Sequence, residues 1–350
     1  MFNYILFDFD NTIYDYDYSH TKALDHMLHT LEKDFHIKDS KNIFKDEKKK
    51  FKYVCYNNAS THNKFIQIKK LFEVLNLPLD KIDYYYDIYQ TIFNDSLLLY
   101  PNIIDFLNFC KNNNIKMFIV TNNLCQIQIQ KMKKLNILSY FTKIYTSEEY
   151  GIEKPDSKLF SYIINDIGCS NNEIVNIGDN FINDINSVTS MDIYSFWFSK
   201  KKFHCNQTYL EFDNYDHLLH FFKRYYEYSN EFIKLSNTLG ERFDLVQAGG
   251  GNTSFKLSDF MFIKSSGSLL SDIDINKNYV GVNYKNITKN ITKKLITITE
   301  KNKKRREYTC NYIINKSIFF LKKYKPSIET SLHSITKKFT VHIHPIQFNM

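Results

Sequence analysis

Two aspartates near the amino terminus, Asp8 and Asp10, follow an apolar run that extends from Phe2 to Phe7. Such a run is typical of a strand that is covered on both faces, and side chains two positions apart in an extended chain point to the same side. Two carboxylates this close raise each other's pKa, so both stay ionised only beside a cation. The pair therefore predicts a magnesium site at the carboxyl end of a central strand, where open α/β sheets bind ligands. By itself, an Asp-x-Asp pair is explained as well by an Asx turn that ends the strand.

The segment Asp8-Phe9-Asp10-Asn11-Thr12 resembles the first motif, DxDx(T/V), of the haloacid dehalogenase (HAD) superfamily. The resemblance implies that Asp8 is the nucleophile that forms an aspartyl-phosphate, and that Asp10 protonates the leaving oxygen and then activates water. Members that dehalogenate lack the second aspartate, so the presence of Asp10 favours phosphoryl transfer. A mutase and a phosphonatase use the same aspartyl nucleophile and stay open as alternatives.

A second apolar run, residues 115–120, ends at Thr121 and Asn122. Taken alone, this ending is a helix N-cap signal. It also resembles the second HAD motif, which implies that the Thr121 hydroxyl and the Asn122 backbone N–H bind the phosphate, helped by the positive end of the following helix. Lys154 precedes Pro155 in a setting that resembles the third motif, in which a lysine neutralises the nucleophile and the phosphate.

A third apolar run, residues 174–177, leads into a segment that resembles the fourth HAD motif, GDxxxxD. The resemblance implies that Asp179 completes the oxygen shell of a magnesium ion together with Asp8 and the backbone carbonyl of Asp10. Asp184 is expected to orient the site. The four motifs together predict a magnesium-dependent phosphatase that acts on a small phosphorylated metabolite such as a sugar phosphate.

The elements that must position these motifs alternate between apolar strands and helices, the pattern of an α/β domain with a parallel, Rossmann-like sheet over residues 1–225. Residues 14–99 show apolar side chains at three- and four-residue intervals, which indicates helices. This segment stands where HAD enzymes carry a helical cap that covers the site and selects substrates. Four of its tyrosines either line the underside of this cap or form its core: Tyr84, Tyr85, Tyr86 and Tyr89.

A separate domain is expected over residues 228–350, with a helix over 230–239 that follows a final helix of the first domain over 215–226. Residues 248–254 (Ala-Gly-Gly-Gly-Asn-Thr-Ser) hold a third of the nine glycines of the chain. A loop of this composition lets backbone N–H groups approach an anion, although a hairpin explains it as well.

A strand and polar loop at 262–267 follow, then the segments 325–333 and 341–345, and the succession resembles the class II aldolase/adducin family. The fold implied for this half is a partial α/β aldolase-like domain. Glu329 is implied to be the acid/base that moves the enolisation proton. The residues implied to bind a substrate phosphate are Asn252, Ser266, Gly267 and Ser327.

His342 and His344 alternate along an expected strand, so both imidazoles face one side, the arrangement for a shared zinc ion. In the family, zinc polarises the donor carbonyl, and a third histidine ligand lies well downstream of this pair. This sequence ends at Met350 without it. An active zinc aldolase therefore competes with two other hypotheses: a non-catalytic, adducin-like binding or assembly module, and a fragment of a longer bifunctional phosphatase/aldolase.

The composition of the chain indicates which classes of binding partner and which compartment to expect. The net charge of +8 accompanies abundant Asn, Ile, Tyr and Phe, which indicates a general bias toward lysine rather than a nucleic-acid-binding patch. The six cysteines show no CxxC spacing, which favours buried thiols in a reducing compartment. No signal peptide is recognisable, and no apolar run approaches the ~20 residues of a membrane helix. We expect a cytoplasmic protein without nucleic-acid or membrane partners, and leave open a homo-oligomer formed through the aldolase-like half.

Overall fold

The computed structural model describes residues 2–56, 58–199, 204–205, 209–297 and 303–343. The chain forms two compact units. One comprises Tyr4–Cys169 and Asn176–Met191, and the other comprises Met1–Asn3, Ser170–Val175 and Asp192–Met350. Within the described ranges, no helix combines the length and the apolar character that a membrane crossing requires.

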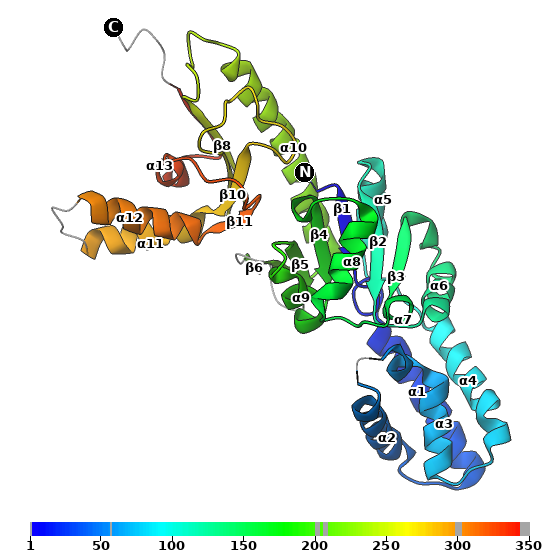
Figure 1. Cartoon of the computed structure of the whole chain (residues 1–350). Helices are drawn as coiled ribbons and strands as arrows, with labels where there is room; N and C mark the ends of the chain where they lie inside the picture. The colour runs from blue at the N-terminus through cyan, green and yellow to red at the C-terminus, as the bar shows by residue number, and fades with distance from the viewer. Residues whose placement is uncertain (1, 57, 200–203, 206–208, 298–302, 344–350) are drawn as a thin grey trace. The chain divides into compact units, whose positions relative to one another are not determined.

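Three of the four predicted motifs lie at strand ends of a seven-stranded sheet (Figure 1), whose strand order is β3-β2-β1-β4-β5-β7-β6. Strands β1, β2 and β3 pair in parallel, so their carboxyl ends lie at one edge of the sheet. Every side chain of β1 from Ile5 to Phe7 is fully buried, as the continuous apolar run predicted. The predicted α/β class with a Rossmann-like parallel core is thereby confirmed. The strands are β1 (Tyr4–Phe7), β2 (Lys116–Thr121), β3 (Lys143–Thr146), β4 (Ile174–Gly178), β5 (Tyr194–Phe198), β6 (His204–Cys205) and β7 (Tyr209–Phe212).

Helices connect these strands, and local signals set their ends. The Asp156 side chain accepts a hydrogen bond from the backbone N–H of Lys158 (2.9 Å) and caps the start of α8, and Gly168, with φ of +72°, ends that helix. The helices of this part of the chain are α5 (Ile103–Asn112), α6 (Cys125–Lys134), α7 (Ser147–Tyr150), α8 (Ser157–Ile167), α9 (Ser187–Thr189) and the π-helix η5 (Phe181–Asn186).

Residues 16–95, the helical segment, lie between β1 and β2 in the sequence. Tyr85 packs in the core of this segment, 5.4 Å from Phe72 between ring centroids, whereas Tyr84 is 55% exposed. Tyr86 and Tyr89 line a cavity. The segment contains α1 (Tyr16–Phe35), α2 (Ser40–Val54), α3 (Lys64–Val74) and α4 (Ile82–Asp95), with short 3₁₀ turns η1 (Ala59–His62) and η2 (Leu79–Lys81).

One helix, α10 (Tyr215–Gly240), stands where two were predicted over 215–226 and 230–239. Neither glycine nor proline interrupts it before Gly240, and buried Tyr225, Tyr228 and Phe232 continue its apolar stripe across the expected break. The prediction of two helices was wrong because the helical periodicity never lapses.

A second, five-stranded sheet follows α10, with the order β11-β10-β9-β8-β12 and antiparallel pairing. Both faces of β9 are covered: Phe262 lies 5.1 Å from Tyr225 of α10, while Met261 and Ile263 pack in a cluster with Ile313 of α12. The elements are β8 (Asn252–Leu257), β9 (Phe260–Lys264), β10 (Tyr279–Asn283), β11 (Ile318–Phe320), β12 (Phe339–His342), α11 (Tyr284–Thr297), α12 (Lys303–Asn315) and α13 (Thr330–Ile335).

Candidate active site

Asp8 directly follows β1, and its backbone N–H donates to a carbonyl of β4 (2.8 Å). Its carboxylate accepts hydrogen bonds from Lys154 Nζ (2.7 Å) and Thr12 Oγ1 (3.0 Å). Burial raises the pKa of Asp8 well above its usual value against the opposing charge of Lys154, and the carboxylates of Asp184 and Asp179 raise it further. Asp8 therefore needs more positive charge than one lysine provides in order to act as an anion.

Lys154 joins two of the predicted acids. Its Nζ donates to Asp8 Oδ1 (2.7 Å) and to Asp184 Oδ1 (2.6 Å). Burial disfavours the charged amine, yet Asp184 and Asp8 outweigh it and raise the pKa of Lys154. The Asn122 side chain positions this lysine, since its Oδ1 accepts from the Lys154 backbone N–H (2.8 Å) and its Nδ2 donates to the Lys154 carbonyl (2.9 Å).

Asp10 lies beside a second buried lysine, Lys131, whose Nζ donates to Asp10 Oδ1 (2.9 Å). Tyr14 donates to the same oxygen (2.5 Å), and Asn123 (3.0 Å) and Gln128 (3.1 Å) donate to Oδ2. Burial by itself would raise the pKa of Asp10, but the charge of Lys131 and these hydrogen bonds lower it to about 2. Asp10 is consequently ionised in the resting site.

Sequence reasoning missed Lys131 and Gln128. The signal for both is their spacing on α6: they lie four and seven residues after Leu124, on the helix face that also holds Leu135. Gln128 is fully buried and Lys131 is 3% exposed. A polar pair inside such a stripe indicates a buried partner, and the partner is Asp10.

Three carboxylates converge where a magnesium ion was predicted. One oxygen each of Asp8, Asp179 and Asp184 lies within 4.8 Å of the others. Burial raises the pKa of Asp179 to about 7, and the Asp184 carboxylate adds to the rise. A β-carbon at Gly178 would lie 2.4 Å from Asp184 Cβ, so only glycine lets this acid approach. Lys154 contacts two of the three carboxylates, those of Asp8 and Asp184, and the hard oxygen donors of all three fit a magnesium ion.

Thr121 ends β2 and is buried beside the acids. Its Oγ1 accepts hydrogen bonds from the backbone N–H of Asn123 (3.2 Å) and from Gln128 Nε2 (2.7 Å). Both contacts use the oxygen as acceptor, so the hydroxyl proton can be donated to a phosphate oxygen.

A cavity of about 260 Å³ opens over these residues. An adjoining cavity of about 320 Å³ shares four of its lining residues, Tyr16, His62, Lys64 and Asn123. The first cavity brings the predicted residues Asp8, Asp10, Thr121, Asn122, Lys154, Asp179 and Asp184 together with Lys48, Lys52, His62 and Lys64 of the helical segment and its turns.

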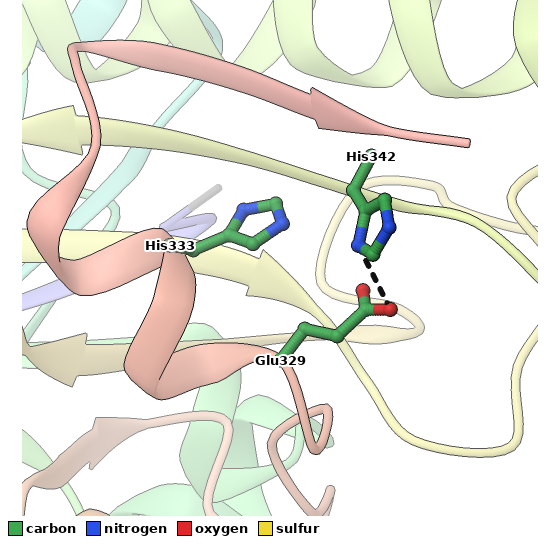
Figure 2. Close-up of side chains that lie close together, drawn as sticks. All are labelled: Glu329, His333 and His342. Carbon is green, nitrogen blue, oxygen red and sulfur yellow. Dashed lines mark ion pairs between the residues drawn. The ribbon is translucent and has the colours of Figure 1, made fainter.

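A different cluster lies in the other unit (Figure 2). Glu329 is the N-cap of α13, His333 lies on α13 and His342 ends β12, and one ligand atom of each lies within 4.8 Å of the others. His342 Nδ1 is 2.9 Å from Glu329 Oε1. His333 Nδ1 is 2.7 Å from Ser254 Oγ, while its Nε2 is buried without a hydrogen-bond partner in the described part of the chain. Burial lowers the pKa of His333 to about 4, so its imidazole is neutral at neutral pH.

His333 was not predicted, and the signal for it is its place four residues after Glu329, one helical turn away. His344, predicted as a zinc ligand, lies outside the described residues. Asn252 pairs with His342 across β8 and β12, which places both side chains on one face. Among the described residues, both amide atoms of Asn252 are buried without a hydrogen-bond partner.

The loops predicted to bind a phosphate in this unit lie side by side. The Ser266 backbone N–H donates to the Lys325 carbonyl (2.8 Å), and Lys264 Nζ donates to the carbonyl of Gly249 (3.3 Å). Gly267 has φ of +80°, a conformation that favours glycine. Of the predicted residues, Asn252 and Ser327 are buried and Ser266 and Gly267 are exposed.

The comparisons with known proteins agree with this geometry in the first part of the chain. The sequence model of the haloacid dehalogenase-like hydrolases matches residues 5–198, more than half of the chain. The chain therefore belongs to the haloacid dehalogenase-like hydrolase family, and the prediction of a HAD hydrolase is confirmed.

Two curated relatives are phosphatases of small sugar phosphates. The ribulose-1,5-bisphosphate 5-phosphatase of Halopiger xanaduensis is 26% identical over 187 residues, which cover 52% of this chain and 78% of the relative. The glyceraldehyde 3-phosphate phosphatase of Methanocaldococcus jannaschii is 30% identical over 104 residues, which cover 30% of this chain and 46% of the relative.

Solved structures share the fold. The HAD hydrolase YfnB from Bacillus subtilis, solved bound to magnesium, superposes with a TM-score of 0.50 at 21% identity, over 63% of this chain and 97% of that one. The 2-haloacid dehalogenase from Pseudomonas syringae superposes with a TM-score of 0.51 at 15% identity, over 64% of this chain and all (100%) of that one. At these identities the similarity concerns the fold alone.

Proposed function

We propose that this protein is a magnesium-dependent phosphatase that hydrolyses small phosphorylated metabolites through an aspartyl-phosphate on Asp8. The observation that carries the proposal is the position of Lys154 Nζ, within 2.7 Å of Asp8 and 2.6 Å of Asp184, at the point where the first, third and fourth motifs converge. The named activities of the curated relatives, on ribulose bisphosphate and glyceraldehyde 3-phosphate, support this substrate class.

The chemistry follows from the charges. An Asp8 oxygen attacks phosphorus, the bond from phosphorus to the ester oxygen breaks, and Lys154 and the Thr121 hydroxyl hold the phosphoryl oxygens. A magnesium ion held by Asp8, Asp179 and the Asp10 carbonyl would supply the positive charge that keeps Asp8 ionised. Asp184 orients Lys154.

Asp10 acts as the general acid and then as the general base. The incoming phosphate raises the pKa of Asp10 from its resting value of about 2, because it places negative charge beside that carboxylate. Asp10 takes up a proton from solvent as the substrate binds and gives it to the leaving oxygen. It afterwards takes a proton from the water that attacks the phosphoaspartate, which releases inorganic phosphate.

In this proposal the phosphatase domain spans residues 1–225, and the helical segment, within residues 14–99, acts as its cap. The lining of the cavity by Lys48, Lys52 and Lys64 supports the cap function, because these residues face the catalytic acids.

The test is phosphate release from a panel of sugar phosphates and nucleotides with magnesium. Asp8→Asn should abolish turnover, whereas Asp105→Asn, which changes an exposed aspartate on α5, should leave it intact. A protein that releases no phosphate from any member of the panel, or an Asp8→Asn variant with unchanged turnover, refutes the proposal.

A second activity, zinc-dependent class II aldolase chemistry, is proposed for residues 228–350 because of the cluster in Figure 2. Two imidazoles and a carboxylate are donors that zinc accepts, and the unpartnered Nε2 of buried His333 supports the fit. His333 and His342 would hold the ion, with His344 as a further predicted ligand, and Glu329 would stay beside the metal as the acid/base. Zinc would polarise a donor carbonyl, and Glu329 would move the proton.

Metal analysis separates this activity from a non-catalytic, adducin-like module. Stoichiometric zinc together with aldol cleavage that Glu329→Gln removes supports catalysis. Protein that contains no zinc after purification from zinc-supplemented medium supports the binding or assembly module. Sequencing past the codon for Met350 tests the fragment hypothesis, because a histidine in a matching context would complete the family's ligand set.

A further inference from the structure

Three lysines of the helical segment bring positive charge to the phosphatase site. Lys48 and Lys52 lie one turn apart on α2, and Lys64 begins α3. All three line the cavity of about 260 Å³ that also contains the catalytic acids Asp8 and Asp10. They therefore face the space that a substrate occupies.

In the described part of the chain, none of these three lysines forms an ion pair. The hydrogen-bond acceptor of Lys64 Nζ is the neutral side chain of Gln67 (3.1 Å). Other lysines of the segment do find carboxylates: Lys50 pairs with Glu47 (2.6 Å) and Lys41 with Asp25 (2.6 Å). Lys45 and Lys49, two exposed lysines of α2, also form no ion pair within the described residues, so what sets Lys48, Lys52 and Lys64 apart is their place in the lining of the cavity.

The acids of the cavity are not ion-pair partners of these three lysines, because they have other contacts. Lys154 already contacts Asp8 and Asp184, and Lys131 contacts Asp10. Asp179 accepts a hydrogen bond from Thr12 Oγ1 (3.4 Å) and is a predicted magnesium ligand. Of the lysines that line this cavity, the three that form no ion pair within the described residues therefore belong to the helical segment.

The lysines repel one another. Burial lowers the pKa of Lys64 well below its usual value, and the charges of three other lysines lower it further: Lys48, Lys131 and Lys52. The carboxylate of Asp10 acts in the opposite direction. Burial and the charge of Lys52 lower the pKa of Lys48, and the carboxylate of Asp17 opposes this by raising it. Like charges one turn apart on a helix destabilise it, so an anion bound beside Lys48 and Lys52 would be stabilising.

The cavity has room for a substrate that reaches from the acids to these lysines. The adjoining cavity of about 320 Å³ shares Lys64 and Tyr16 with it and extends the space along Tyr86 and Tyr89. A phosphoryl group on Asp8 and a second one on the lysines can then belong to one small molecule. Phosphate suits lysine because it accepts several charge-assisted hydrogen bonds.

We propose that the site prefers bisphosphorylated sugars, with the scissile phosphate at Asp8 and the second, retained phosphate bound by Lys48, Lys52 and Lys64. The inference rests on the proposed phosphatase function and specifies its substrate class. Monophosphates of the same sugars leave the three lysines uncompensated and bind more weakly.

The experiment compares kcat/KM for matched pairs: ribulose 1,5-bisphosphate against ribulose 5-phosphate, and fructose 1,6-bisphosphate against fructose 6-phosphate. We expect the ratio of bisphosphate to monophosphate to exceed roughly tenfold in the unaltered protein, the size of one or two charge-assisted hydrogen bonds. The double variant Lys48→Ala/Lys52→Ala should lower that ratio roughly tenfold or more. A control double variant, Lys45→Ala/Lys49→Ala, alters exposed lysines of the same helix and should keep the ratio.

Binding to the Asp8→Asn protein, measured by calorimetry, separates the two proposals. The second phosphate site is supported if the bisphosphate binds at least tenfold more tightly than the monophosphate and Lys64→Gln reduces this difference. This result holds even if the unaltered protein releases no phosphate. In that case the phosphatase proposal alone fails. A ratio near one in the unaltered protein, or a ratio that the Lys48→Ala/Lys52→Ala change leaves as it was, overturns the inference.

Discussion

The site around Asp8 and the cluster of Glu329, His333 and His342 differ in how their charge is balanced. In the first, Lys154 contacts Asp8 and Asp184 and Lys131 contacts Asp10, and further lysines face the same cavity. In the second, the partner of Glu329 is an imidazole, and His333 is neutral at neutral pH. A strongly charged pocket suits a phosphate with magnesium, whereas nitrogen donors in a nearly neutral pocket suit zinc.

The largest expected effect comes from Lys154→Met. This change leaves the buried carboxylates of Asp8 and Asp184 facing each other without their lysine, which should lower turnover by at least roughly a thousandfold and the free energy of unfolding by about 3 kcal/mol. Phosphate release and urea denaturation measure the two effects. The exposed Lys158 provides the control, since Lys158→Met should change neither quantity. Unaltered activity in Lys154→Met would mean that the charges around Asp8 are not balanced as described.

His333→Ala tests the second region. We expect the zinc content, measured by mass spectrometry on protein purified from zinc-supplemented medium, to fall from about one ion per chain to a small fraction, because one of three clustered donors is lost. His217→Ala, which alters an exposed histidine of α10, should keep its zinc. Equal zinc in the two variants would remove His333 from the ligand set.

Lys131→Met tests whether Asp10 depends on its own lysine. A carboxyl pKa lowered to about 2 stabilises the fold above the unfolded value of about 4, and this contribution is lost as the pH falls through 2. Without Lys131 the pKa of Asp10 rises, so the acid limb of the kcat profile should move up by about one to two pH units. The exposed Lys134 is the control, because Lys134→Met should keep the original profile.

The smallest effect concerns pH and the metal-free protein. The pKa of Asp179 is raised to about 7, so its contribution to stability is present below the unfolded value of about 4 and is lost as the pH rises through 7. In EDTA, the free energy of unfolding should therefore decline between pH 4 and pH 7. Magnesium should remove much of this decline, and Asp179→Asn should make it shallower; an identical decline in Asp179→Asn would contradict the assignment to Asp179.

The first site was largely predictable because its residues occupy special places along the chain. Asp8 and Asp179 each follow an apolar strand and Thr121 ends one, and parallel strands bring their carboxyl ends to one edge. Lys154 was predicted through its resemblance to the third motif. Asn122 was predicted too, but only for its backbone N–H. The structure adds a contact of its side chain with the backbone of Lys154.

The partners of Asp10 and the positive lining of the cavity were not predictable in the same way. Lys131 lies on a helix from which the sequence analysis expected only a positive end near the phosphate. Lys48, Lys52 and Lys64 are a few among many lysines of a chain with 46 lysines and arginines. Which lysine meets a carboxylate and which faces a cavity depends on how the helices pack against one another.

The amino-acid sequence by itself determined the α/β class, the order of the four motifs and the identity of the acids at the strand ends, because strand periodicity and motif spacing are local properties of the chain. Only the tertiary structure decided that 215–240 is one helix, that His333 joins Glu329 and His342, and that three cavity lysines have no carboxylate partner among the described residues. These features depend on distances between residues far apart in the sequence, and local patterns carry no measure of such distances.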